Sequence, residues 1–242
     1  MIDEDGIQRG VSPDLKEAFI VDELIVRSKD LEREKLELTV TGGKDINKYF
    51  FKKPGKYVIY TRKADENTTF PHIESIINSF EESITCKEVE QGKHPIWSLH
   101  RARNPRIFSK EEKILGVITG DRINVALDNY QTYPTDGIYL FRTNGRVSNR
   151  VLLGLLNSKI STFLYRLLST EVSRVLAQVK PSLLIQLPIP NKFGQSNTVA
   201  LESKVSEILA LKKEDAAADT SRLEAEIDLM VYKLYKLTYE EV

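Results

Sequence analysis

Residues 113–141 read KILGVITGDRINVALDNYQTYPTDGIYLF and contain three short apolar runs. The runs lie at residues 114–118, 123–127 and 137–141, and Gly, Asp and Pro residues separate them. Short runs of β-branched and aromatic residues between such turn residues are typical of strands. We therefore expect three strands here, arranged as an antiparallel meander.

The sequence before this region contains further strand-like runs, at residues 18–22, 35–40 and 57–61. They share the β-branched and aromatic composition of the central runs. Residues 71–84 instead place apolar side chains three or four positions apart, which predicts a helix that begins at a proline. A second small sheet with a helix on one face is the expected result.

The clearest helical pattern in the first two hundred residues covers residues 148–168, and Ser148 or Asn149 can cap its start. The apolar run 183–190 is expected to be extended, because each of its two prolines forces the preceding residue out of the helical region.

Residues 198–237 again show helical spacing, in two stretches with a polar segment between them. That segment leaves two alternatives open, an antiparallel hairpin or one long helix. The sequence therefore predicts an α+β protein with small, mostly antiparallel sheets and packed helices. We expect a main domain over residues 1–192 and a C-terminal helical segment over residues 198–242.

The charges of the chain are unevenly placed, although 35 basic and 35 acidic residues give 242 residues a formal net charge of zero. Residues 1–37 carry a net charge of −5, residues 38–199 of +9 and residues 200–242 of −4. Neutrality is thus a sum over unlike segments and does not argue against an acidic partner such as DNA. A hydrophobic fraction of 41% excludes a disordered or collagen-like chain.

The single cysteine, Cys86, excludes an internal disulfide, and three histidines add no Cys/His framework for a structural zinc ion. The longest apolar run, residues 182–190, is shorter than the roughly 18–20 residues that span a bilayer. The acidic start of the chain does not resemble a secretory signal. We therefore expect a reduced, cytoplasmic protein without a membrane segment, either whole or cut from a longer polypeptide.

Motifs of known catalytic sites are absent from the sequence, including the glycine-rich phosphate loops and the nucleophile elbow. Two fragments, Glu111-x-Lys113 and Glu202-x-Lys204, match part of a metal-dependent nuclease pattern. Such three-residue charge patterns arise by chance in any charge-rich chain, so a nuclease that uses Glu111 and Lys113 is only a minor alternative. We predict no catalytic, cofactor-binding or metal-binding residue in this chain.

Binding chemistry is concentrated in a basic segment over residues 44–63, which holds seven basic residues and one acid with Tyr and Phe interleaved. Basic side chains neutralise phosphates while planar rings pack on sugars or bases, so this mixture suits nucleic acid. The same alternation also describes an ordinary half-buried strand. The predicted DNA contacts in this segment are Lys44, Lys48, Lys52 and Arg62.

A second basic segment, residues 97–106, carries three arginines on a stretch that a proline keeps from being a regular helix. Arginine forks read guanine edges and grip phosphates bidentately, which lysine cannot do. A solvated basic loop is the alternative. The predicted DNA contacts in this second segment are Arg101, Arg103 and Arg106. Residues 142–180 form a third basic region with a single acid.

Short strings spread along the whole chain also carry a resemblance. The chain resembles the TaqI-like C-terminal specificity domain, the target-recognition part of type II, often type IIG, restriction-modification adenine methyltransferases. The strings are Gly6-Ile-x-x-Gly10, Ala18-Phe-Ile-Val-Asp22, Gly43-Lys-Asp-Ile-Asn-Lys-Tyr49, Tyr57-Val-Ile-Tyr60, Trp97-Ser-Leu-His100, Leu153-Gly-Leu-Leu-Asn-Ser158, Leu187-Pro-Ile-Pro190 and a closing segment over residues 227–241.

The resemblance implies a division of labour. An upstream methyltransferase domain in the same polypeptide binds S-adenosylmethionine and flips the target adenine. This chain reads the neighbouring bases of double-stranded DNA and holds no cofactor itself, and the parent protein is in some cases also an endonuclease. The resemblance further implies a DNA contact at Arg174, and Lys236 stands where the closing segment usually has glycine. The alternative function is a non-catalytic protein-interaction module that docks a partner through helices in 198–242.

Overall fold

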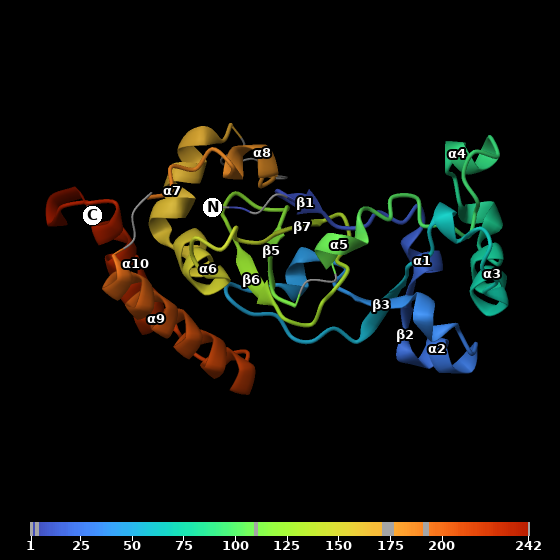
Figure 1. Cartoon of the computed structure of the whole chain (residues 1–242), viewed down its shortest axis with the longest axis horizontal. Coiled ribbons are helices and arrows are strands. Elements are labelled where there is room, and N and C mark those ends of the chain that lie inside the picture. Colours follow the sequence, from blue (N-terminus) through green and yellow to red (C-terminus); the bar gives the residue numbers. More distant parts are fainter. Residues whose placement is uncertain (1, 3–4, 109–110, 171–176, 191–193, 242) are drawn as a thin grey trace.

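Two small antiparallel sheets form the frame of the protein (Figure 1). The computed structural model describes residues 2, 5–108, 111–170, 177–190 and 194–241. One sheet has the strand order β1-β7-β5-β6 and the other the order β2-β4-β3, and all neighbours are antiparallel. The expected α+β class is therefore confirmed. The strands are β1 (Gln8–Arg9), β2 (Ile20–Asp22), β3 (Leu36–Thr39), β4 (Lys56–Ile59), β5 (Lys113–Val117), β6 (Val125–Asp128) and β7 (Ile138–Phe141).

Helices lie at both ends of the elongated molecule, with α3 and α4 beyond the β2-β4-β3 sheet and α6 to α10 beside the other sheet (Figure 1). Their bounds are α1 (Lys16–Phe19), α2 (Glu23–Ser28), α3 (Pro71–Asn78), α4 (Lys87–Glu90), α5 (Pro105–Phe108), α6 (Asn149–Asn157), α7 (Lys159–Leu168), α8 (Pro181–Leu184), α9 (Gln195–Glu214) and α10 (Ser221–Leu234). Short 3-10 turns occupy Arg33–Lys35, Gly43–Asp45, Lys63–Asp65, Glu81–Ser83 and Tyr239–Glu241.

The predicted meander is wrong in its strand order. Strand β5 is central, and β7 pairs with β5 and not with its sequence neighbour β6. The segment between β6 and β7 is long enough to leave the sheet and pair with the chain around β3. The Tyr133 amide donates to the Leu38 carbonyl over 2.7 Å, and the Thr135 amide donates to the Val40 carbonyl over 2.9 Å. This connection therefore joins the two sheets and brings β7 to the other edge of β5.

Both faces of the central strand are buried, which explains its continuous apolar sequence. All residues of β5 are buried. Leu115 and Val117 belong to a core shared with the β2-β4-β3 sheet, while Ile114 belongs to a second core with α6, α9 and α10. Alternate side chains of a strand point to opposite faces, so one strand supplies both cores.

The predicted helix over residues 148–168 is two helices, α6 and α7, which meet at an angle of 67°. Ser158 lies between them in an extended conformation. Its hydroxyl accepts a hydrogen bond from the Ser161 amide and so caps the start of α7. Serine competes for backbone hydrogen bonds in this way, and apolar periodicity does not reveal it. No single helix in the described part of the chain is long and apolar enough to cross a membrane; α6 and α7 reach that only as a bent pair.

The expectation of an extended run over residues 183–190 is wrong at its start, because α8 includes Leu183 and Leu184. A proline at the first helical position, Pro181, favours this turn. Similarly, the strand expected at residues 18–22 begins only at Ile20, after the short helix α1. In both cases, residues expected to be extended belong to a short helix that lies beside the extended segment.

The C-terminal segment forms a hairpin of α9 and α10, which decides between the two alternatives left by the sequence. Lys204 of α9 lies 2.7 Å from Glu226 of α10 across the hairpin. Helix α9 also packs closely on α6 at Gly154, where a Cβ atom would lie 2.9 Å from Val205 Cγ2. The hairpin thus shares the second core with α6, while the proposed division near residues 192–198 stays a prediction.

Lys236 ends α10 in a left-handed conformation, with φ of +59°. The Lys236 amide donates to the Lys233 carbonyl and the Leu237 amide to the Tyr232 carbonyl, each over 3.1 Å, which is a Schellman motif. Glycine is favoured at this position because a Cβ atom is strained there. The left-handed backbone explains why the closing segment usually has glycine at the position of Lys236.

We therefore expect Lys236→Gly to increase the free energy of unfolding by up to about 1 kcal/mol, because it removes left-handed strain from the helix end. Urea denaturation of the chain measures the change. The matched control is Lys233→Gly inside the same helix, which should decrease stability by about 1 kcal/mol. A loss of stability in both variants would contradict this account of the helix end.

Candidate nucleic-acid interface

The predicted contact residues fall into two groups near opposite ends of β4. Lys44 and Lys52 lie on the side of Lys56, where β4 begins, and Arg62 follows its end. At about 3.3 Å per residue, β4 itself extends over roughly 10 Å, and Arg62 lies three residues beyond its end. The structure therefore separates Lys44 and Lys52 from Arg62, which belongs to the same basic segment of the sequence.

The lysines surround a groove of about 480 Å³, here called the lysine groove. Lys44 and Lys52 line it together with Lys53 and Lys56, and all four are exposed. Ala216, from the turn between α9 and α10, lies on its border. Among the described residues that line the groove, Asp45 alone carries a negative charge. The groove is suited to a phosphate backbone, because it concentrates positive charge along a concave surface.

The loop that carries Lys44 and Lys48 is fixed to the edge of β6. The Tyr49 amide donates to the Val125 carbonyl over 2.9 Å, and the Leu127 amide donates to the Tyr49 carbonyl over 3.2 Å. Tyr49 is buried and has φ of +70°. A strand edge that would otherwise be open thus anchors the loop by backbone hydrogen bonds.

Asn157, at the end of α6, continues this arrangement on β6. Its side-chain amide donates to the Val125 carbonyl over 2.9 Å and its Oδ1 accepts from the Val125 amide over 3.2 Å. The Gly43–Tyr49 and Leu153–Ser158 strings quoted above therefore meet at Val125. Their shared role is to position the lysine loop on the sheet.

Lys48 already has a partner within the chain. Its ammonium lies 2.7 Å from Glu224 Oε2 of α10 and 5.8 Å from the centre of the Tyr49 ring. The ion pair joins the lysine loop to the C-terminal hairpin. Of the three predicted lysines, Lys48 is thus the one whose charge is partly neutralised, and its DNA contact stays a prediction.

Arg103 lies close to both Arg101 and Arg9 of β1, and these three residues are here called the arginine cluster. Partial desolvation, and then the positive charges of Arg101 and Arg9, lower the pKa of the Arg103 guanidinium. Arg9 and Arg101 are both exposed. The Asp136 carboxylate opposes this lowering of the Arg103 pKa. One carboxylate offsets only part of three positive charges, so the cluster is suited to a further anion such as a phosphate, or to base edges.

Close backbone contacts hold the arginine cluster together. Ser12 and Arg101 exchange two backbone hydrogen bonds of 3.1 Å, and Arg103 Nε donates to the Gly10 carbonyl over 3.3 Å. A Cβ atom on Gly10 would lie 2.1 Å from the Pro134 carbonyl oxygen, so only glycine allows this approach. Sequence reasoning missed Arg9, because it is a single arginine in an acidic segment and only the pairing of β1 with β7 places it here.

Arg62 lies near the cluster, just beyond the end of β4, and Arg106 follows Arg103 by three residues, on α5. Tyr60 links Arg62 to the cluster, because the Tyr60 hydroxyl donates to the Arg103 carbonyl over 3.4 Å and the Arg62 guanidinium lies 6.0 Å from the Tyr60 ring centre. Arg62 also lies 4.0 Å from Asp65, and Arg106 lies 3.9 Å from Asp5. Arg174 lies outside the described residues.

The nuclease fragments do not converge into a site. Lys113 is completely buried, and its ammonium lies 2.6 Å from Asp128 Oδ2, while Glu111 is exposed. Burial lowers the pKa of the Lys113 ammonium, and the Asp128 carboxylate opposes this shift. In the other fragment, Lys204 is paired with Glu226. These lysines hold the fold together.

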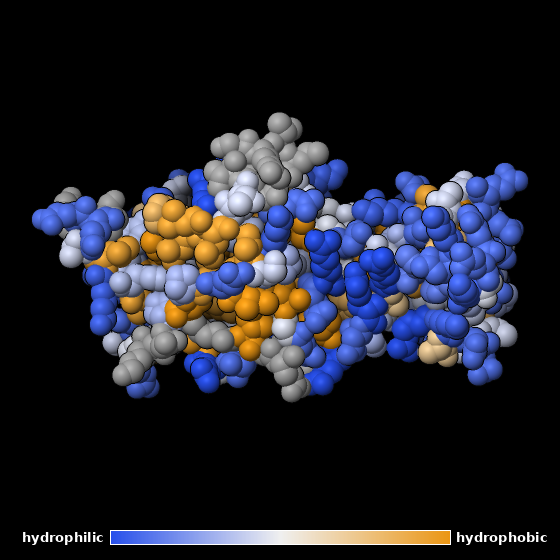
Figure 2. All heavy atoms as spheres, turned by 90° about the horizontal axis from the view of Figure 1, so that it is seen from above, coloured by the Kyte–Doolittle hydropathy of each residue, from blue (hydrophilic) through white to orange (hydrophobic). Residues whose placement is uncertain are grey.

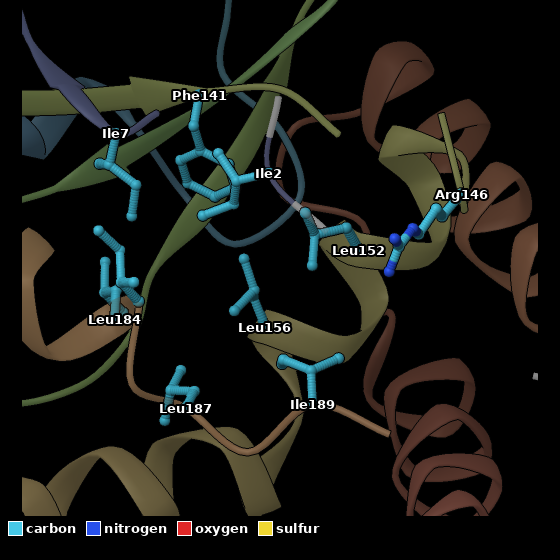
Figure 3. A pocket seen from close by; sticks show the side chains of 10 residues that line it. Ile2, Ile7, Phe141, Arg146, Leu152, Leu156, Leu184, Leu187 and Ile189 are labelled. Carbon is cyan, nitrogen blue, oxygen red and sulfur yellow. The ribbon is translucent and has the colours of Figure 1, made fainter. Parts of the chain in front are cut away.

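An apolar pocket of about 220 Å³ lies between β7, α6 and the Leu187–Ile189 segment. Figure 3 shows aliphatic side chains from these elements directed into it, with Ile2 and Ile7 on one side and Arg146 on another. Arg146 is the one charged residue among the described residues that line it. The pocket therefore offers an apolar surface and no set of groups for acid–base catalysis.

Comparison with known families gives one match that covers most of the chain. Residues 38–189 match the model of the TaqI-like C-terminal specificity domain. The chain belongs to this family. The two β6-anchoring strings and all the described residues of the predicted DNA interface lie inside the matched segment of the specificity domain, whereas Arg9 lies before it. No curated protein matches the sequence.

The fold of the specificity domain is also found in a restriction-modification enzyme of known structure. A superposition on the type IIL enzyme MmeI, solved in complex with DNA, has a TM-score of 0.66 at 13% identity and covers 96% of this chain. The chain corresponds to 33% of the MmeI chain, so it spans about a third of that protein. The type IIG endonuclease BpuSI aligns over 97% of this chain and 31% of its own, with a TM-score of 0.48 and 9% identity.

Proposed function

We propose that this specificity domain recognises a sequence in duplex DNA and positions it for an adenine-N6 methyltransferase domain that precedes it in the same polypeptide. The observation that carries the proposal is the gathering of Arg9, Arg101 and Arg103 at one site of a domain in this family. The similar fold of MmeI was solved with DNA bound. S-adenosylmethionine belongs to the catalytic domain, and the whole protein acts on DNA in the cytoplasm.

The two basic sites fit two parts of DNA recognition. Arginine forks distinguish base edges, above all guanine, so the arginine cluster supplies sequence choice. Lysines are strongly hydrated point charges that suit phosphates, so the lysine groove supplies affinity that does not depend on sequence. The backbone contacts that hold both sites are expected to keep them at a constant separation along the duplex.

Titration of a labelled duplex at increasing salt tests the proposal. If the four groove lysines and up to three cluster arginines neutralise phosphates, the slope of log K against log salt will lie between about −4 and −6. Fluorescence anisotropy measures this on the chain alone and on the full parent protein. Absence of duplex binding at low salt in both proteins would refute the proposed function.

An apolar patch on α7 and α8 supports the presence of a catalytic domain beside this one. Phe163 and Leu167 on α7 are 57% and 68% exposed, and Ile185 after α8 is 63% exposed. Figure 2 shows that apolar residues gather over this half of the surface while the other half is hydrophilic. Contiguous exposed apolar surface of this kind usually marks an interaction site.

The occupant that we propose for the patch is the methyltransferase domain. The chain spans a third of the MmeI chain, so a relative of this architecture has ample polypeptide to cover it. Ile2 lines the apolar pocket together with Ile185, so a preceding domain would join the chain beside the patch. By contrast, most of the apolar stripe of α9 and α10 is buried against the partner helix and α6. The exposed apolar residues of this hairpin are Val199, Leu211 and Leu229. Docking through these helices is therefore the less favoured alternative.

Phe163→Ser with Leu167→Ser is therefore expected to leave the melting temperature of the isolated chain nearly unchanged and to lower methylation by the parent protein several-fold. The substituted side chains are exposed in the chain but covered in the parent. Leu24→Ser on α2, where Leu24 is 78% exposed, is the control that should change neither quantity. Unchanged methylation in the double variant would show that the patch is not this interface.

A further inference from the structure

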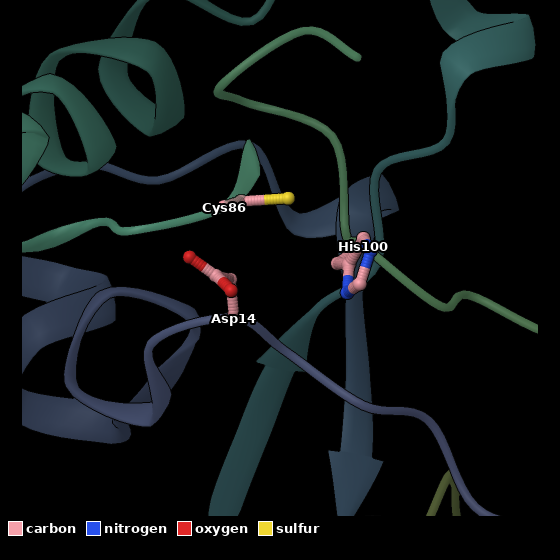
Figure 4. A group of neighbouring side chains, drawn as sticks. All are labelled: Asp14, Cys86 and His100. Carbon is pink, nitrogen blue, oxygen red and sulfur yellow. The ribbon is translucent and has the colours of Figure 1, made fainter. Parts of the chain in front are cut away.

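Asp14, Cys86 and His100 come from three separate segments and meet at one point. One ligand atom from each lies within 4.8 Å of the other two. Figure 4 shows the three side chains directed into a common space between the segment before α1, the start of α4 and the turn that carries His100. Cys86 is buried, His100 is partly buried and Asp14 is exposed.

A fourth donor adjoins this group. Glu88 Oε2 lies 3.3 Å from the Cys86 sulfur and 3.6 Å from His100 Nε2. His94 stands behind the group, with its ring centre 5.8 Å from that of His100 and its Nε2 at 2.9 Å from the Ser98 carbonyl. The only cysteine of the chain and two of its three histidines thus gather here.

The chemistry of these donors fits zinc. A thiolate, an imidazole and carboxylates are its usual protein ligands, bound at about 2.0–2.3 Å in a tetrahedron. The edges of such a tetrahedron measure about 3.5 Å. The separations among Asp14, Cys86 and His100, which are at most 4.8 Å, exceed this by about 1 Å, and rotation of the side chains can close that difference. Calcium and magnesium prefer oxygen ligands and do not suit a site with sulfur and nitrogen.

We propose that Cys86, His100, Asp14 and Glu88 bind one zinc ion that orders the segment carrying the arginine cluster. His100 directly precedes Arg101, and Asp14 follows Ser12, which exchanges two hydrogen bonds with the Arg101 backbone. A metal bonded to both segments locks this contact. The sequence argued against a metal site because one cysteine and three histidines form no Cys/His framework, and only the tertiary fold brings these ligands together.

Zinc binding itself does not rest on the proposed DNA function, so it is tested without DNA. The chain, stripped of metal with a chelator, is titrated with Co²⁺ and then with Zn²⁺. We expect one Co²⁺ per chain with a sulfur-to-cobalt absorption band in the near ultraviolet, and displacement of the band by Zn²⁺. Cys86→Ser removes the band, and His100→Ala weakens binding at least tenfold. His72→Ala, on α3 and outside the cluster, leaves both unchanged.

Thermal unfolding separates a lost ligand from a lost fold. Zn²⁺ should raise the melting temperature of the wild-type chain and of His72→Ala, but not that of Cys86→Ser, which is nearly isosteric and keeps its circular dichroism spectrum. Absence of a cobalt band in the wild-type chain, or a band that persists in Cys86→Ser, overturns the site. If the wild-type chain binds zinc but its selectivity for the chosen duplex does not change when the zinc is removed, the proposed role of zinc at the arginine cluster is overturned.

Discussion

Arg101→Ala will reduce the preference of the domain for its selected duplex over random DNA by roughly tenfold or more, because a bidentate arginine–base contact discriminates by about 1–3 kcal/mol. The Arg101 side chain is exposed, so its removal leaves the fold unchanged. Arg103→Lys keeps the charge but removes the fork, and it should reduce the same preference. Competition between a duplex selected from a random pool and a scrambled one measures the ratio.

Lysine variants are expected to behave differently. Lys52→Ala should weaken binding to both duplexes by the same factor and make the salt slope shallower by about 1, because a phosphate contact carries no sequence information. Lys233→Ala, an exposed lysine on α10, serves as the control. If the arginine and lysine variants all lose affinity for the selected and the random duplex by the same factor, the division of roles between the arginine cluster and the lysine groove is wrong.

The second large effect concerns the buried ion pair of the central sheet. Asp128→Asn is expected to lower the free energy of unfolding by about 3–5 kcal/mol, because it leaves a buried ammonium without its counter-charge. The remaining acceptor of Lys113 is the Phe108 carbonyl at 2.9 Å. Lys113→Met should cost less, about 1–3 kcal/mol. Asp128 then keeps its donors in the Tyr130 amide and in the amide and hydroxyl of Thr132.

The pH dependence of the Asp128→Asn variant gives a further check. Burial lowers the pKa of Lys113 in the folded chain, and the variant removes the carboxylate that opposes this shift. A lysine whose folded pKa is depressed binds fewer protons in the folded than in the unfolded state, so stability rises with pH up to the ordinary lysine pKa. Urea denaturation between neutral pH and pH 10 should show this rise in Asp128→Asn and not in the double variant with Lys113→Met.

The double variant also closes a thermodynamic cycle. If the two residues interact as the structure shows, its loss of stability will be smaller than the sum of the two single losses. Additive losses would mean that the pair contributes through its separate hydrogen bonds only. The sequence did not predict the pairing of Lys113 with Asp128, because Lys113 matched a nuclease fragment instead.

Local patterns predicted which segments form strands and helices, and they did so well at β3, β4 and β7. β3 alternates apolar and polar residues, β7 is wholly apolar, and β4 is apolar after Lys56, so local chemistry alone marks them. The breaks were harder. Ser158 splits a continuous apolar periodicity, because its side chain competes with the helix for a backbone amide.

The predicted interface shows the same limit. Basic segments in the sequence pointed to Lys44, Lys52, Arg101 and Arg103, which the structure places at the lysine groove and the arginine cluster. The sequence could not show that Lys48 is paired with Glu224 or that Arg9 lies close to Arg103. Nor could it show that Gly10 allows the backbone to approach the Pro134 carbonyl. Each of these depends on residues far apart in the chain.

By itself, the sequence determined the fold class, the family strings and the basic character of the middle of the chain, because these follow from composition and short-range periodicity. The tertiary structure alone decided the strand order, the pairing of Lys113 with Asp128, and the meeting of Asp14, Cys86 and His100. The physical reason is that such contacts arise only when the two cores are buried and non-local backbone hydrogen bonds form, and no local pattern encodes which partners they join.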